Sequence, residues 1–172
     1  MNEFLLTFCF SGKAKKAPGT FGSLASIIFW LAISYIFFAK NINIETQNIF
    51  WLIFLSAAFI YGSIASPAYA KQFGEIDHGS IVLDEVVGQI IALQMSFVLF
   101  YQNYFWQAKL VVIHLFLSFI LFRYFDIKKP LFIGYFDRKF KNGFGVMFDD
   151  LVSGIIAGII TIIFFKLTLL KA

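Results

Sequence analysis

Long apolar runs are the feature that most constrains what this chain can become. A helix needs about 20 mostly apolar residues to cross a bilayer, and four or five runs come close to that length. They cover approximately residues 20–39, 48–70, 84–106, 110–122 and 146–165. With 60% hydrophobic and 14% charged residues, the chain lies outside the range of soluble globular proteins. We therefore expect one all-α domain over residues 1–172, a polytopic membrane helical bundle of four to five transmembrane helices with cytoplasmic loops forming the site.

The basic residues are unevenly divided between the two sides of such a bundle. If the N-terminus is cytoplasmic, ten lysines and arginines lie inside and four, Lys40, Lys109, Lys166 and Lys171, lie outside. The positive-inside rule favours that orientation. The formal charge of +4 suits anionic membrane lipid, whereas no separate basic helix indicates nucleic acid. We expect lipid as a partner and no nucleic acid, and the sequence does not indicate an oligomeric state.

Two acidic pairs stand at the beginning of two apolar runs. Gly88 follows Asp84-Glu85 and Gly154 follows Asp149-Asp150, each glycine four residues after one of the acids. Positions i and i+4 share a helix face, and glycine lets two membrane helices approach closely. We therefore expect these two helices to cross near their cytoplasmic ends and to bring four carboxylates together.

Four carboxylates beside hydrocarbon would repel one another unless they are paired or bind a metal. A divalent cation is the simplest compensation, and oxygen ligands without nearby histidine or cysteine favour magnesium, manganese or calcium over zinc. Each acid could instead only cap its helix and interact with the helix dipole. The matching pairs favour a metal site formed by Asp84, Glu85, Asp149 and Asp150.

A second motif, AKKAPGTFGSLAS, occupies residues 14–26. Residues 18–20 predict a turn, and the following residues open the first apolar helix, where free backbone N–H groups bind anions readily. Taken alone, the segment is more typical of a helix cap combined with a basic membrane anchor. The neighbouring lysines nevertheless make Thr20, Gly22 and Ser23 candidates for binding phosphate.

With these stretches assembled, the chain resembles the phosphatidylglycerophosphatase A family. The likeness rests on PGTFGSLAS, IVLDEVVGQIIAL, and FRYFDIKKP with FDRKFKNGFGVMFDDLVSGIIAG, within residues 18–26, 81–93 and 122–158. One departure is Asn142-Gly143, where members of the family tend to have two glycines. The resemblance implies a helical, magnesium-dependent enzyme of the bacterial inner membrane. Such an enzyme hydrolyses phosphatidylglycerophosphate to phosphatidylglycerol and phosphate in phospholipid biosynthesis.

The resemblance also implies which residues form the site. The family's acidic and basic motif positions correspond to Asp77, Asp84, Glu85, Asp126, Asp137, Asp149, Asp150, Arg123, Lys129 and Arg138. With the patterns above, it predicts Mg²⁺ on the two acidic pairs and either Asp126 or Asp137 as the base for an attacking water. Lys129 and Arg138 would bind phosphate oxygens together with residues 20–23. Asp77 and Arg123 are further possible site residues, and a phosphoaspartyl intermediate is the rival route.

A membrane cation transporter or channel is the alternative function, because acids at helix ends could also pass metal ions. Against it, the acids gather at one face, and none lies in mid-span, where a translocation site is expected. A purely structural scaffold would leave the loop carboxylates unexplained. The sequence therefore predicts a phosphatidylglycerophosphate phosphatase, a phosphoric monoester hydrolase whose active site faces the cytoplasm.

Overall fold

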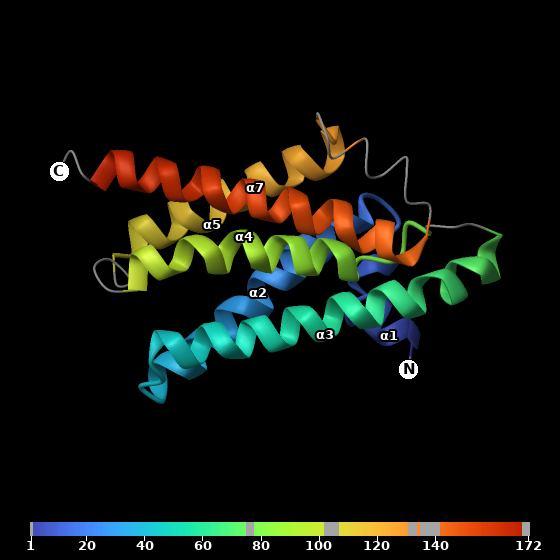
Figure 1. The fold of residues 1–172 in the computed structure, drawn as a ribbon, viewed down its shortest axis with the longest axis horizontal. Coiled ribbons are helices and arrows are strands. Elements are labelled where there is room, and N and C mark those ends of the chain that lie inside the picture. Colours follow the sequence, from blue (N-terminus) through green and yellow to red (C-terminus); the bar gives the residue numbers. More distant parts are fainter. Residues whose placement is uncertain (1, 75–77, 102–106, 131–133, 135–141, 170–172) are drawn as a thin grey trace.

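The computed structural model is a bundle of long helices (Figure 1). It describes residues 2–74, 78–101, 107–130, 134 and 142–169. The helices are α1 (Asn2–Leu6), α2 (Pro18–Ala39), α3 (Ile44–Ala70), α4 (Leu83–Tyr101), α5 (Ala108–Lys128) and α7 (Gly143–Leu169), with short 3-10 helices at Ser11–Lys13 and Lys71–Phe73. The described residues contain no strand, so the predicted all-α class is confirmed.

Among the described residues, four helices are long and apolar enough to cross a membrane, namely α2, α3, α5 and α7. This number agrees with the four to five spans predicted from the sequence, although the predicted span at residues 84–106, which contains α4, is not one of the four. Large apolar side chains cover their outer faces, with Ile28 of α2 69% exposed and Leu52 of α3 67% exposed. Such faces are expected where a helix borders lipid rather than water.

Helix α4 occupies the centre of the bundle and contacts α2, α3, α5 and α7. Most of its buried apolar residues belong to the main hydrophobic core: Leu83, Val86, Val87, Ile90, Leu93 and Phe97. A helix that is apolar around most of its circumference is stable only when other elements surround it. The central position of α4 follows from that pattern and fixes where its acidic first turn lies.

The crossing of α4 and α7 depends on two glycines. A Cβ atom added to Gly154 would lie 2.8 Å from the Cα of Gly88, and one added to Gly88 would lie 2.5 Å from the carbonyl oxygen of Asp150. Both distances are too short for a real side chain, so the helix backbones touch at this point. The predicted close crossing of these two helices is confirmed.

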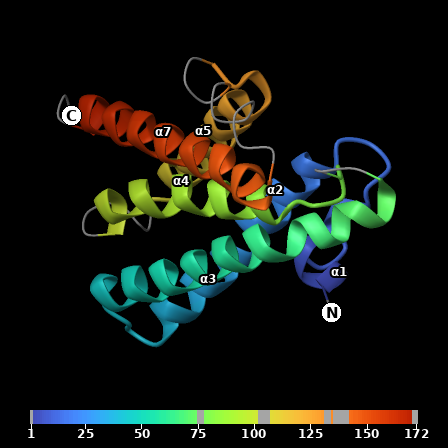
Figure 2. The same cartoon turned by 45° about the vertical axis from the view of Figure 1, so that its right-hand side comes forward.

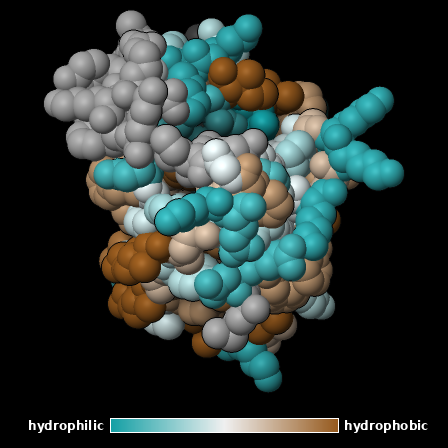
Figure 3. All heavy atoms as spheres, turned by 90° about the vertical axis from the view of Figure 1, so that its right-hand side faces the viewer, coloured by the Kyte–Doolittle hydropathy of each residue, from teal (hydrophilic) through white to brown (hydrophobic). Residues whose placement is uncertain are grey.

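One end of the bundle is polar. The N-terminal segment lies at that end with the beginnings of α2, α4 and α7, whereas the last turns of α4 and α7 and the connection between α2 and α3 lie at the opposite end (Figures 1 and 2). Hydrophilic side chains cover much of the polar end when it faces the viewer (Figure 3). The first turns of α2, α4 and α7 therefore meet the last turns of α3 and α5 there.

Helix α5 is longer than the apolar run that predicted it. The run ends near residue 122, but the helix continues to Lys128. Arg123 and Asp126 therefore lie on the last turns of a rigid helix rather than in a loop. In the middle of the same helix, the buried His114 ring makes a 2.6 Å hydrogen bond to Ser96 of α4, as expected for a histidine inside an apolar span.

Candidate metal and phosphate site

Three carboxylates from two helices form a compact cluster at the polar end. Asp84 and Glu85 lie in the first turn of α4, and Asp150 lies near the beginning of α7. One oxygen atom from each side chain lies within 4.8 Å of the others. Asp84 is 8% exposed and Asp150 is 3% exposed. The close backbone contact between α4 and α7 brings these acids together although they are far apart in the sequence.

The bonding of Glu85 indicates that this cluster could hold a cation. Its Oε2 atom is buried and has no hydrogen-bond partner among the described residues, and its Oε1 atom lies 3.9 Å from Nη1 of Arg123. The N–H of Glu85 donates to Oδ1 of Asp84. A buried carboxylate oxygen without a donor is costly, and carboxylate oxygens are the ligands that hard divalent cations prefer. The residues present therefore fit a divalent metal ion.

Gly19 brings the beginning of α2 against this cluster. A Cβ atom at that position would lie 3.1 Å from the Glu85 carboxylate carbon and 3.1 Å from Nη1 of Arg123. Only a residue without a side chain allows this approach. The turn predicted at residues 18–20 is wrong, because these residues form the first turn of α2, with Pro18 at its first position. The contact of Gly19 with Glu85 depends on how α2 packs beside α4.

The predicted phosphate-binding residues of α2 have structural contacts of their own. Thr20 donates its N–H to the carbonyl oxygen of Ala17. Gly22 packs against Val82, whose Cβ would lie 2.6 Å from a Cβ at residue 22. The Ser23 hydroxyl donates to the carbonyl oxygen of Gly19 at 2.8 Å. Phosphate binding by Thr20, Gly22 and Ser23 stays a prediction.

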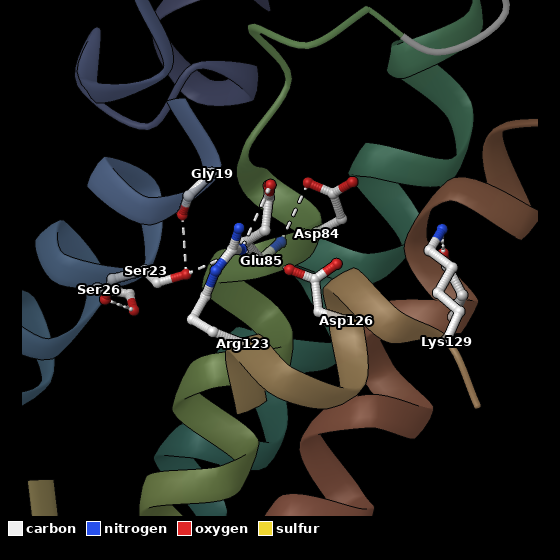
Figure 4. A network of polar contacts seen from close by, with 9 residues as sticks. Gly19, Ser23, Ser26, Asp84, Glu85, Arg123, Asp126 and Lys129 are labelled. Atoms are coloured by element: carbon white, nitrogen blue, oxygen red, sulfur yellow. Dashed lines mark hydrogen bonds and ion pairs between the residues drawn. The ribbon is translucent and has the colours of Figure 1, made fainter. Parts of the chain in front are cut away.

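Arg123 joins three helices around the acidic cluster (Figure 4). Its Nη1 atom donates to Oδ2 of Asp126 on the same helix and to Oγ of Ser23 on α2, at 3.5 Å. The same atom lies 3.9 Å from Oε1 of Glu85 on α4. Asp126 also lies close enough to Glu85 and Asp150 to interact with both electrostatically. Arg123 and Asp126 therefore belong to the edge of the cluster.

The remaining acid of the two predicted pairs makes a different contact. Asp149 accepts an ion-paired hydrogen bond from Nζ of Lys129. Lys129 caps the C-terminus of α5 in a left-handed conformation with φ 41°. The Asp149 side chain is 5% exposed and that of Lys129 is 30% exposed. Asp149 thus lies outside the group of three carboxylates, although it is adjacent to Asp150.

Three residues named from the sequence, Asp77, Asp137 and Arg138, lie outside the described residues, so their roles stay predictions.

One residue that sequence reasoning missed is Gln89, which is fully buried one turn after Glu85. Neither its amide nitrogen nor its amide oxygen has a hydrogen-bond partner within the described parts of the chain. Buried amides usually have partners. Two features of the sequence could have indicated Gln89: it is an amide within an apolar helix, and it follows Glu85 by four residues and so shares its helix face.

Comparison with known proteins gives a consistent result. The chain matches the family described as phosphatidylglycerophosphatase A over residues 4–165. It is 38% identical to phosphatidylglycerophosphatase A of Haemophilus influenzae over 87% of this chain and 80% of that protein. It is 35% identical to phosphatidylglycerophosphatase A of Escherichia coli K12 over 87% of this chain and 76% of that protein.

A further relative carries a different name. It is a putative phosphatidylinositol-3-phosphatase of Bacteroides thetaiotaomicron, 33% identical over 84% of this chain and 81% of that protein. All three relatives are therefore named as phosphatases of lipids with a phosphorylated head group. No solved structure matches the chain.

Proposed function

We propose that this chain, which belongs to the phosphatidylglycerophosphatase A family, hydrolyses phosphatidylglycerophosphate to phosphatidylglycerol and phosphate with the help of a divalent cation. Two relatives bear the name of that activity, and both cover most of the chain. The observation that carries the proposal is the buried cluster of Asp84, Glu85 and Asp150, formed where α4 and α7 cross. A divalent cation held by these carboxylates would bring positive charge to the phosphate of the lipid.

Asp84, Glu85 and Asp150 would hold the cation, and magnesium suits their oxygen atoms. When bound, a divalent ion supplies positive charge that stabilises the transferred phosphoryl group and lowers the pKa of a water molecule. In this assignment Asp149, the fourth acid predicted as a ligand, instead positions Lys129. The uncompensated Oε2 atom of Glu85 supports the presence of a cation in the native enzyme.

The neighbouring side chains would carry out the proton transfer and bind the phosphate. A water oxygen forms the new bond to phosphorus while the bond from phosphorus to the glycerol oxygen breaks. Asp126 accepts the proton of that water, and Arg123 holds Asp126 in place through their ion pair. The glycerol oxygen takes its proton from solvent. Lys129 and Arg138 would contact the phosphate oxygens.

The enzyme would lie in the bacterial inner membrane with the cluster on the cytoplasmic side. The four apolar helices support a multi-pass arrangement, and the surplus of lysine and arginine at the polar end supports this orientation. The acyl chains of the substrate would stay in the bilayer beside the helices, so only the head group enters the site. The transporter alternative finds no support in the names of the relatives.

Phosphate release from detergent-dispersed phosphatidylglycerophosphate tests this proposal. The purified protein should release phosphate when Mg²⁺ is present and should lose that activity when a chelator is added. Asp150→Asn should abolish release without lowering the yield of folded protein. Glu45→Gln is the matched control, because Glu45 begins α3 at the opposite end of the bundle. Release by Asp150→Asn at the wild-type rate would refute the role of the cluster.

A further inference from the structure

A second candidate site, a cavity, lies at the same end of the bundle as the acidic cluster. Its volume is about 450 Å³, which is within the range of small-molecule sites. Three separate parts of the chain form it: the N-terminal segment with the start of α2, the end of α3, and the connection to α4. Its polar wall includes Glu3, Lys13, Lys15, Tyr69, His78 and Ser80.

The described residues of the cavity wall carry a net positive charge. Nζ of Lys13 lies 2.6 Å from Oε1 of Glu3, and this hydrogen bond raises the pKa of Lys13. Lys15 is exposed, and none of the described residues forms an ion pair with it. With one acid and two lysines among its described residues, the wall favours an anion.

His78 lines the cavity, and its hydrogen bonds indicate which ring nitrogen carries the proton. The backbone N–H of Ser80 donates to Nδ1 of His78 at 3.2 Å. A backbone N–H can only donate, so in the neutral ring Nδ1 is the acceptor and Nε2 carries the proton. The ring stacks on Phe73 with 3.9 Å between centroids. The Ser80 hydroxyl lies 2.7 Å from Nδ1 and 3.3 Å from the Tyr69 hydroxyl.

The cavity and the acidic cluster share a wall. Pro18 lines the cavity, and the next residue, Gly19, touches the carboxylate of Glu85. Consecutive Cα atoms are about 3.8 Å apart, so only one residue of backbone separates the two sites at this point. On the other wall, Ser80 lines the cavity and lies four residues before Asp84. The cavity therefore lies directly beside the acidic cluster.

We propose that this cavity binds the phosphodiester of the lipid substrate, the phosphate group that remains after hydrolysis. This inference rests on the proposed function, because that substrate carries two phosphates joined by a glycerol. The terminal phosphate enters the acidic cluster, while Lys13, Lys15 and the Nε2–H of His78 bind the diester oxygens. Free inorganic phosphate has similar chemistry and is the other possible source of the anion.

Lys15→Ala and Lys16→Ala form the matched pair of variants for the test. Both lysines are exposed and adjacent, and both substitutions remove one positive charge, but only Lys15 lines the cavity. Each variant is assayed on phosphatidylglycerophosphate and on phosphatidic acid, which has a terminal phosphate but no diester. Lys15→Ala should raise KM about tenfold for the first lipid and leave KM for the second unchanged. Lys16→Ala should change neither value.

The assignment would be overturned if Lys15→Ala and Lys16→Ala changed KM equally, or if Lys15→Ala raised KM equally for both lipids. His78→Phe supplies a second variant, since it keeps an aromatic ring against Phe73 but removes the Nε2–H donor. His78→Phe should likewise raise KM for phosphatidylglycerophosphate and leave KM for phosphatidic acid unchanged. Retention of the wild-type KM for that lipid by a folded His78→Phe protein would count against the proposed donor.

Calorimetric binding of glycerophosphoglycerol separates this inference from the proposed function. That compound contains the diester and no cleavable phosphate. The wild type should bind it, and Lys15→Ala should bind it about tenfold more weakly. If no lipid is hydrolysed but this binding is observed, the proposed function fails and the anion site stands. Absence of binding, or equal binding of inorganic phosphate, would overturn the diester site.

Discussion

Replacing Gly154 by alanine should separate the two helices that form the acidic cluster. A Cβ at this position would lie 2.8 Å from the Cα of Gly88, whereas carbon atoms in contact are normally about 3.5–4.0 Å apart. The helices must therefore move apart by about 1 Å at the crossing. Overpacking of this kind costs about 1–3 kcal/mol of unfolding free energy.

The same shift should affect the metal site more strongly than it affects stability. Mg²⁺ requires ligand distances of about 2.0–2.1 Å, whereas Ca²⁺ tolerates a looser site. A misplacement of about 1 Å can cost about 100-fold in rate. Gly154→Ala should therefore lower kcat/KM about 100-fold and raise the Mg²⁺ concentration needed for half-maximal activity. The two measurements are phosphate release over a Mg²⁺ titration and thermal unfolding.

Gly158→Ala provides the matched control on the same helix. Its Cβ would lie 3.1 Å from Cβ of Met95 and 3.2 Å from Sδ of the same residue, so a shift of a few tenths of an ångström relieves the contact. Activity should stay within about threefold of the wild type, because this shift is much smaller than the one that Gly154→Ala requires. Wild-type activity and Mg²⁺ requirement in Gly154→Ala would refute the idea that this crossing sets the geometry of the cluster.

Three further substitutions test other contacts of the site. Lys129→Met removes the ion pair of Lys129 with the buried carboxylate of Asp149 and should lower the unfolding free energy by about 1–3 kcal/mol. Adding Asp149→Asn to this variant should restore the melting temperature. No recovery in the double variant would contradict the pairing. Arg123→Lys keeps the positive charge but removes the Nη1 atom that contacts both Asp126 and Ser23. We expect kcat to fall at least about tenfold with little change in the melting temperature, and an unchanged kcat would argue against a positioning role. Ala17 precedes α2 in a left-handed conformation with φ 51°. Ala17→Gly should therefore raise the unfolding free energy, measured by denaturant titration, by about 0.5–1 kcal/mol. A lower unfolding free energy in this variant would show that no strain is relieved.

Helix packing explains why the α4–α7 crossing could be predicted from the sequence. The acid and the glycine four residues later share a helix face, so the close approach at Gly88 and Gly154 follows from spacing alone. The sequence analysis grouped Asp149 with Asp150. Adjacent helical residues point in directions about 100° apart, and only Asp150 shares a helix face with Gly154 four residues later. Asp149 instead contacts Lys129 at the end of α5, a contact between distant segments that no local pattern indicates.

Contacts between segments distant in sequence were beyond prediction. The approach of Gly19 to Glu85 depends on how α2 packs beside α4, and the turn motif around residue 19 contains no signal for it. The helical position of Arg123 and Asp126 was also missed, because the apolar run ends before them and charged residues predict a loop. The cavity beside the acidic cluster is lined by Lys15, Tyr69 and His78 from three segments. No local sequence pattern predicts that these residues lie together.

Binding of Mn²⁺, measured by electron paramagnetic resonance on the purified protein, tests the central claim most directly. That claim is that Asp84 and Glu85 of α4 share one divalent cation with Asp150 of α7. Asp84→Asn, Glu85→Gln and Asp150→Asn should each weaken Mn²⁺ binding at least about tenfold, while Asp149→Asn should bind it nearly as tightly as the wild type. Wild-type affinity in Asp150→Asn, or equal losses in the Asp149 and Asp150 variants, would contradict the account.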